Sequence, residues 1–394
     1  MTSADRIHGV IAAGFTERQA RFLEAVLLHS GVCLGRQYLA HRGVVRGRKQ
    51  HDFFATLRAR RLATRYPTAH RRAHLYHVHG RRLYRAIGEP ESRHRKPTTL
   101  GRAVERLMVL DAVLGSPEMR WLGTASEKIA YFTTATSLRV EELPHLTFGV
   151  AGARQVRTFP DKLPIGVADD GRAHVFLYGV TREVSLEFRT FLQRHAELFR
   201  ALPEWEIRLL VPQHLAAAAP RFEAVVRDEL ARPLRLDAIW ELHWYFEQRQ
   251  RVERGDAAED QAEFDRLGQV FRAPRFWALY RTWLQEGDAV LNGLASSVLA
   301  DAMGRFRGLV TSQVMPHNYQ HLATLMGTAW GREGNTGGNT DWGAVFPPTD
   351  GSTAQELSSR VARSGARKPL HISAIAGTGR SVDRYLPGAG RQRK

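Results

Sequence analysis

Two histidines and a tyrosine lie close together in the segment AHLYHVHGRRLY, residues 73–84. On a β-strand His77 and His79 would point to the same face, so both imidazoles could bind one metal ion. Tyr84 follows five residues later, and a tyrosine beside such a metal could attack a phosphodiester bond. The segment therefore allows metal-dependent DNA nicking. The same residues could equally form one strand of a basic hairpin that binds DNA.

A nicking site of the HUH type needs a third metal ligand and an antiparallel sheet of its own around the histidine pair. His74 would lie on the opposite face of the strand from that pair, which leaves two ligands. Tyr84 lies in RRLYRAIG, a pattern typical of a helix that packs Leu83 and Ile87 on a core. We therefore expect histidines of a hairpin, with an HUH-type nickase as the alternative.

The elements around the histidines predict a winged helix-turn-helix domain over residues 1–97. Thr16 is a candidate N-cap, and apolar residues follow it at helical spacing. Glycines are expected to end the first two helices at Gly31 and Gly43. The expected elements are helices over 16–30, 33–43 and 47–63, then a hairpin of two extended segments over 64–68 and 74–80. Three short helices followed by a hairpin is the order of a winged helix, in which the third helix reads DNA.

The charge distribution favours the same function. The net charge is +17, and residues 1–100 carry 20 Lys and Arg against 6 Asp and Glu, whereas residues 101–330 carry 27 against 29. A concentrated basic field attracts the phosphates of nucleic acids. The candidate DNA-binding residues lie on the third helix, at the tip of the wing and beside the hairpin: Arg46, Arg48, Lys49, Gln50, His51, Arg58, Arg60, Arg61, Arg71, Arg72, His77, Arg81 and Arg82.

Residues 98–215 predict a small mixed α/β domain. Residues 89–98 have the composition of a linker, and an amphipathic helix is expected over 99–114. The order of the following elements is comparable with the core of restriction-type nucleases: strands over 145–150, 157–169 and 173–181, a helix over 185–202 and a strand over 206–212. Such nucleases hold a divalent cation between an Asp on one strand and an acid-x-Lys on the next.

Pro160 and Asp161 would supply the first of those two catalytic elements. The next strand, HVFLYGV, carries neither an acid nor a lysine, so the oxygen ligands for Mg²⁺ are incomplete. The acids in ADDG, residues 168–171, are expected in the turn between the strands. Glu183 and Glu187 are the nearest others. We expect no catalysis, with a divergent nuclease that uses Asp161 as the alternative.

The remaining chain divides into a helical region over residues 216–330 and an irregular basic tail over residues 331–394. The aromatic residues of the helical region are spaced as in packed helices. This region is the expected surface for a homodimer contact or for a partner protein. The fold class is thus α+β and mostly helical, with an N-terminal winged helix-turn-helix, a central nuclease-like domain and a helical C-terminal region.

The N-terminal third resembles the winged helix of the replication-relaxation family of plasmids and integrative elements. The resemblance lies in GFTERQARFLEAV, GRKQHDFFATLRARRLA and HLYHVHGRRLYRAIG, and FPDKLPIGVADDGRAHVFLYGV is similar in order to the strand pair of that family's degenerate nuclease-like domain. The acidic residue usual on the second strand is absent here. The resemblance covers about residues 15–212, and it implies a DNA-binding protein of a mobile element.

Several other classes of protein are disfavoured. No Gly-rich loop ending in Gly-Lys-Ser/Thr is present to bind a nucleoside triphosphate, and Cys33 is the single cysteine. We expect no cofactor and no metal. No apolar run is long enough to span a membrane, and the N-terminus lacks the pattern of a signal peptide, so a cytoplasmic location is expected. The expected partner is double-stranded DNA, bound for control of transcription, replication or transfer. The third alternative is an assembly subunit that recruits other proteins to DNA.

Overall fold

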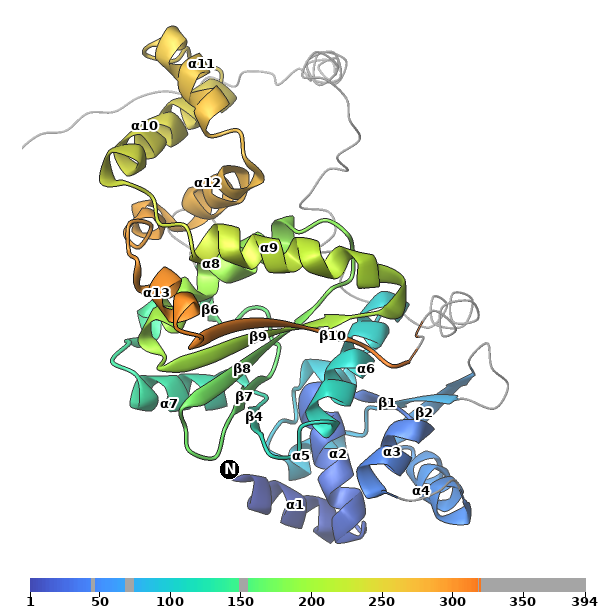
Figure 1. Cartoon of the computed structure of the whole chain (residues 1–394). Helices are drawn as coiled ribbons and strands as arrows, with labels where there is room; N and C mark the ends of the chain where they lie inside the picture. The colour runs from blue at the N-terminus through green and yellow to red at the C-terminus, as the bar shows by residue number, and fades with distance from the viewer. Residues whose placement is uncertain (44–46, 68–73, 149–154, 318, 320–394) are drawn as a thin grey trace, which may run out of the picture. The chain divides into compact units, whose positions relative to one another are not determined.

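The computed structural model describes residues 1–43, 47–67, 74–148, 155–317 and 319, which form a mixed α/β fold rich in helices (Figure 1). The N-terminal elements are α1 (Ser3–Ala12), α2 (Glu17–His29), β1 (Val32–Leu34), α3 (Gly35–Arg42), α4 (Arg48–Ala59), β2 (Ala63–Pro67), β3 (His74–Val78) and α5 (Arg81–Ala86).

Local sequence signals place most of these N-terminal boundaries. Thr16 and Gln19 form a reciprocal capping box at the start of α2. Gly43 ends α3 in the left-handed conformation, with φ of 60°, which glycine adopts without steric cost. The predicted helices over 16–30 and 47–63 are confirmed. Cys33 was expected in a helix and lies instead in β1, because Val32–Leu34 pairs with β3.

The three N-terminal strands form an antiparallel sheet in the order β1-β3-β2. Side chains alternate between its two faces. Cys33, Tyr76 and Val78 belong to the core that α2 and α4 close. Leu34 and Leu75, from the other face, belong to a second core with α6 (Leu100–Leu114). The sheet is therefore covered by helices on both faces.

A second sheet has five strands in the order β10-β9-β8-β7-β4. The pairs β4–β7 and β7–β8 are antiparallel, whereas β8–β9 and β9–β10 are parallel. The strands are β4 (Arg120–Leu122), β7 (Ile165–Val167), β8 (Ala173–Gly179), β9 (Glu204–Val211) and β10 (Gly308–Val314). The predicted turn between β7 and β8 is confirmed, since Gly171 donates to the carbonyl of Ala168 and has φ of 71°.

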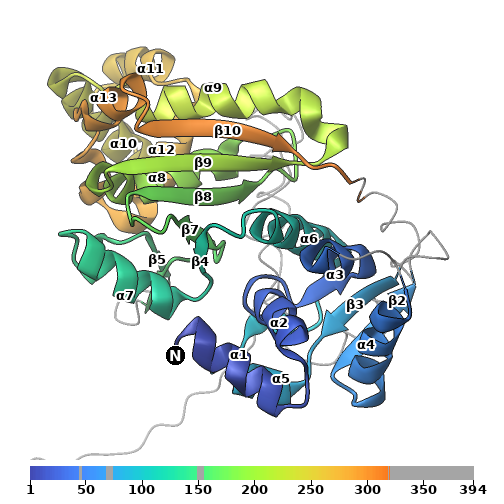
Figure 2. The ribbon, with the colours of Figure 1, turned by 60° about the horizontal axis from the view of Figure 1, so that its bottom comes forward.

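Helices cover both faces of this second sheet (Figure 2). Phe176, Ile207 and Leu209 pack against α7 (Ala125–Ala135), α8 (Leu186–Ala201) and α9 (Ala219–Leu230). Val175 and Leu177 point the other way and pack against α6. Helix α6 thus contributes to one continuous apolar core between the N-terminal sheet and the five-stranded sheet.

Three expectations for the body of the protein need correction. The region over residues 216–330 is not wholly helical, because β10 pairs in parallel with β9. The segment 89–98 is not a bare linker, because His94 is buried and lies in a short 3-10 helix, η1 (Arg93–Arg95). The strand expected over 157–169 is divided between β6 (Gln155–Thr158), which pairs with β5 (His145–Phe148), and β7.

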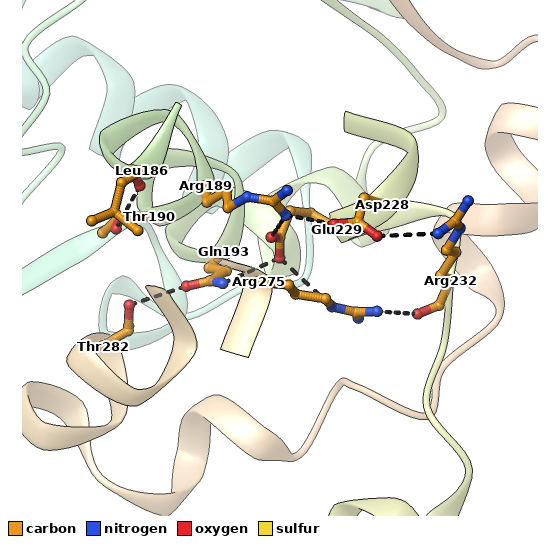
Figure 3. Close-up of polar contacts among 9 residues, drawn as sticks. All are labelled: Leu186, Arg189, Thr190, Gln193, Asp228, Glu229, Arg232, Arg275 and Thr282. Carbon is orange, nitrogen blue, oxygen red and sulfur yellow. Dashed lines mark hydrogen bonds and ion pairs between the residues drawn. The ribbon is translucent and has the colours of Figure 1, made fainter. Parts of the chain in front are cut away.

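Buried charges connect α8 and α9 to helix α12 (Pro274–Glu286) (Figure 3). Glu229 on α9 accepts from Arg189 and Gln193 on α8, and it lies beside Arg275 on α12. The helices beyond α9 are α10 (Leu236–Glu253), α11 (Gln261–Val270), α12 (Pro274–Glu286) and α13 (Val298–Gly304). Helices α10, α11 and α12 share a core around Leu242, Phe246 and Trp283. In the described part of the chain no helix has the length and apolarity needed to cross a membrane.

Candidate nucleic-acid interface

Helix α4 presents one apolar face and one charged face. Phe53, Phe54 and Leu57 are buried, and the ring of Phe54 stacks on Tyr76 of β3 at a centroid distance of 3.9 Å. The aromatic stack fixes α4 against the hairpin. The rest of its surface exposes basic side chains from the first turn to the last, on both flanks of the apolar face, with Asp52 among them: Arg48, Lys49, His51 and Arg58.

The charged face of α4 continues onto the hairpin. Arg65 of β2 is exposed and stands opposite Tyr76 in the sheet register. His74 of β3 lies on the same face of the sheet as Tyr76. Burial lowers the pKa of His74, and the charges of Arg65, Arg58 and His51 lower it further. The side chains of α4 and the hairpin therefore face one another across one basic surface.

Arg65 and His74 were not among the sequence-predicted site residues. Strand periodicity could have placed His74, because it is two residues from Tyr76 and would share its face. The sequence pattern of β3 did not indicate which of its two faces α4 covers. Leu75, Tyr76, His77 and Val78 are all buried, so no apolar–polar alternation marks either face.

Four of the predicted residues have structural contacts of their own. The Gln50 amide packs against Gly35, where an added Cβ would lie 2.2 Å from its Nε2 atom. Arg60 donates to the carbonyls of Ala13 and Gly14 at 3.1 and 3.3 Å. Arg48 lies 3.8 Å from Asp52, and Arg81 lies 2.7 Å from Glu91, in exposed ion pairs. Gln50 and Arg60 thus position α4.

The other predicted residues divide into three groups. Arg61 and Arg82 are exposed, and Arg61 follows the C-cap of α4 with φ of 53°. Arg46, Arg71 and Arg72 lie outside the described residues. His77 requires a correction, because it is 3% exposed and its Nε2 atom lies 2.9 Å from the His94 carbonyl. It faces η1 rather than α4, so its side chain is not available to a phosphate at the basic surface.

The histidine pair that suggested a metal site is arranged for packing. Burial lowers the pKa of His77 to about 4, and His79 lies 2.9 Å from the hydroxyl of Thr64. Tyr84 is fully buried, donates to the Val78 carbonyl at 3.0 Å, and has its pKa raised by burial. Within the described ranges no three His, Cys, Asp or Glu side chains are grouped to hold a metal ion.

Asp161, the acid that was expected to belong to a nuclease-like strand pair, is bound by an arginine. Arg194 Nη1 lies 2.9 and 3.1 Å from its two carboxylate oxygens, and His195 Nδ1 lies 4.0 Å away. Burial lowers the pKa of His195 to about 4, so this neighbour is neutral near pH 7. Lys128 is buried nearby and donates to the Leu163 carbonyl, and burial lowers its pKa to about 7. The guanidinium of Arg194 therefore binds the carboxylate oxygens that a divalent metal ion would need as ligands.

Helix α3 is fixed to α6 through Asp111. Arg36 donates to both carboxylate oxygens of Asp111 at 2.8 and 2.6 Å, and Gln37 donates to one of them at 2.9 Å. The hydroxyl of Tyr319 also donates to Asp111. The helix that precedes α4 is thus held by a two-pronged ion pair.

No known protein family, curated protein or solved structure matches this chain.

Proposed function

We propose that residues 1–97 form a winged helix-turn-helix domain that binds duplex DNA, with α4 as the recognition helix. The element order α2-β1-α3-α4-β2-β3 and the antiparallel sheet β1-β3-β2 support this proposal. The observation that carries it is the basic surface that His51 and Arg58 of α4 form with Arg65 and His74 of the hairpin. Within the described residues, Arg58 and Arg65 on this surface, and Lys49 on the other flank of α4, have no carboxylate within 4 Å. Such cations are suited to the phosphates beside the major groove.

The remaining chain is proposed to act as a body without catalysis. The antiparallel meander β4-β7-β8, followed by α8 and the parallel strand β9, is comparable with a nuclease core. Its acid, Asp161, is paired with Arg194, and β8 carries Phe176 and Tyr178 where a second acid and a lysine would be needed. The resemblance to the replication-relaxation family extends the proposal to a mobile element, whose transcription, replication or transfer the protein would control.

The test of DNA binding uses the full chain and a labelled duplex in fluorescence anisotropy at several salt concentrations. The Lys49→Gln/Arg58→Gln variant is expected to bind on the order of 10-fold more weakly at low salt, because two phosphate contacts are lost. The slope of the logarithm of the binding constant against the logarithm of the salt concentration should also become shallower by about 2. Arg254→Gln/Arg272→Gln is the matched control, since both arginines are exposed on the helical region. Absence of wild-type binding at low salt, or equal losses in both variants, would contradict the proposal.

A second prediction concerns catalysis. The purified protein is expected to leave supercoiled and single-stranded DNA uncut in Mg²⁺ or Mn²⁺, because Arg194 holds Asp161 and the buried Tyr84 hydroxyl is bonded to a backbone carbonyl. Relaxed, linear and protein-linked products would be sought on gels. Cleavage that Asp161→Ala abolishes would establish a nuclease, and cleavage that Tyr84→Phe abolishes would establish a nickase.

A second candidate function is recruitment of a partner protein through the helical region. Helices α10 and α12 expose large apolar side chains, among them Trp240 at 76% and Trp277 at 54%. Exposed aromatic residues are common at protein–protein interfaces. This activity is compatible with DNA binding by the N-terminal residues, and a homodimer would use the same kind of surface.

A further inference from the structure

A second group of cations lies outside the basic surface of α4 and the hairpin. Arg102 and Arg106 are on α6, Arg93 is in η1, Arg157 is on β6, and Lys162 follows Asp161. We call these five residues the α6 cationic cluster. None of them was among the residues expected to contact DNA, and they come from three separate segments of the chain.

Backbone geometry supports the position of Lys162 in this cluster. Arg93 Nη2 donates to the Lys162 carbonyl at 3.0 Å, which joins η1 to the turn over residues 159–162. Phe159 and Lys162 have φ of 49° and 57° in that turn, a conformation that costs about 1–2 kcal/mol for a residue with a Cβ. Strain of this kind is often found where a functional side chain must be presented. Asp161 is paired with Arg194, whereas Lys162 remains exposed.

The charges of the α6 cationic cluster are poorly compensated. In the ranges that the structure describes, none of the five cations has a carboxylate oxygen within 4.0 Å. Nη1 of Arg106 is buried and has no hydrogen-bond partner there. The acids nearest the cluster are Glu105, which faces Arg93 and Arg106 and has Glu187 beside it, and Asp161, whose carboxylate is paired with Arg194.

The cations also repel one another. Burial lowers the pKa of Arg93 to about 9, and the charges of Arg106 and Arg102 contribute. Lys162 is in contact with solvent, but its surroundings desolvate it in part and lower its pKa to about 8, with further contributions from Arg93, Arg157, Arg102 and Arg106. Like charges held together at the cost of mutual repulsion would be stabilised by a bound anion.

We propose that the α6 cationic cluster is a second binding site for nucleic acid, which takes phosphates of the DNA backbone beside the strained turn that carries Lys162. Arg102 and Lys162 are exposed and would contact phosphates directly. Arg93 and Arg106 are partly buried and would add charge, and Arg93 also holds η1 against the turn. This inference rests on the proposed DNA binding only for the identity of the polyanion, because the cluster shares no residue with the basic surface of α4 and the hairpin.

The distribution of the cluster favours a polymer over a small phosphate. Its cations belong to η1, α6 and the segment 155–162, and three of them, Arg102, Arg157 and Lys162, are exposed. A single inorganic phosphate would be met most strongly by donors that converge in an enclosed pocket. A chain of phosphodiesters can engage several exposed cations in succession, and each contact releases a counterion.

The test compares three full-length variants by anisotropy with one labelled duplex over a range of salt. Arg102→Gln/Lys162→Gln removes exposed cations of the cluster, Lys49→Gln/Arg58→Gln removes those of α4, and Arg254→Gln/Arg272→Gln is the control. Circular dichroism checks that each variant is folded. The cluster variant is expected to reduce the magnitude of the salt slope by about 2, because about 0.9 counterions are released for each phosphate contact. Its affinity at low salt should fall by about 10-fold.

Comparison of the variants distinguishes the two proposals, and competition with small phosphates identifies the source of the phosphate groups. If only the cluster variant binds the duplex more weakly, the second site is supported and the role of α4 is overturned. If only the α4 variant binds more weakly, the role of α4 is supported and the second site is overturned. If neither variant differs from the control, both proposals are wrong. Inorganic pyrophosphate and ATP are added as competitors and in thermal-shift assays. The assignment to DNA would be overturned if these small phosphates raise the melting temperature of the wild type but not of the cluster variant, while the cluster variant keeps the wild-type salt dependence of DNA binding.

Discussion

Replacement of Asp111 by alanine is expected to lower the free energy of unfolding by about 2–4 kcal/mol and to loosen α3. Asp111 is 14% exposed and accepts both prongs of the Arg36 guanidinium. Without the carboxylate, this half-buried cation would lose its counter-ion, and Gln37 and Tyr319 would each lose an acceptor. The loss would fall on the helix that supports α4.

Asp111→Ala is expected to loosen β1 and α3 in addition to lowering the stability of the whole protein. Gln37 is 1% exposed, and its amide also joins the backbone of Leu34 to that of Leu107. Weakening of the contact between α3 and α6 should therefore expose amides of β1 and α3 before those of the five-stranded sheet. Hydrogen exchange followed by mass spectrometry would detect faster exchange in peptides that cover residues 32–42.

Glu91→Ala is the matched control for Asp111→Ala. Glu91 also pairs with an arginine, Arg81, at 2.7 Å, but the two side chains are 75% and 57% exposed. Exposed pairs contribute about 0–1 kcal/mol. Equal urea midpoints for the two variants, or unchanged exchange in β1 and α3, would show that Asp111 does not hold α3 to α6.

Local chemistry made most of the N-terminal elements predictable. Thr16 with Gln19 begins α2, and Gly43 ends α3, because a cap and a left-handed residue act within a few positions of the chain. The strands that were missed depend on distant partners. Val32–Leu34 is too short to show a period, and it is defined by pairing with β3. β10 joins β9 from about 100 residues away in the sequence.

The candidate sites were predictable only where one element carries them. The cationic residues of α4 share one helix, so the sequence suggested their surface directly. His77 was expected to contact DNA, but β3 is buried on both faces, so its sequence does not show which side chains face α4 and which face η1. The pairing of Asp161 with Arg194 joins residues 33 positions apart, and the α6 cationic cluster joins three segments. No local pattern encodes such a contact.

The largest loss of stability is expected at Glu229, which lies between two arginines (Figure 3). Glu229 is 3% exposed, and the side chains of Arg189 and Arg275 are 9% and 7% exposed. In Glu229→Ala the guanidinium groups of Arg189 and Arg275 would remain buried, and each would lose the Glu229 carboxylate as a counter-ion. Removal of one partner from a buried ionic group typically costs about 3–5 kcal/mol, so Glu229→Ala should lower the free energy of unfolding by that amount.

The neighbours of Glu229 indicate which arginine would suffer more. Arg189 retains Asp228 at 2.6 Å, whereas Arg275 retains only the Arg232 carbonyl, at 2.8 Å, among its hydrogen bonds in the described chain. Gln193, which donates to Glu229 at 3.1 Å, also accepts from Thr282 of α12. Loss of Glu229 should therefore weaken the attachment of α12 to α8 and α9 more than it weakens the contact between α8 and α9.

A double-mutant cycle measures this coupling by urea unfolding followed by circular dichroism. Arg275→Met removes the cation that Glu229→Ala would leave unpaired, so the double variant should be more stable than the sum of the single effects implies, by about 1 kcal/mol or more. Arg232→Ala is the control, because its side chain is 73% exposed and its pair with Asp228 spans 3.3 Å, a type that contributes about 0–1 kcal/mol. Strict additivity of the two substitutions would mean that Glu229 and Arg275 act independently, and that their ion pair does not hold α12 to α9.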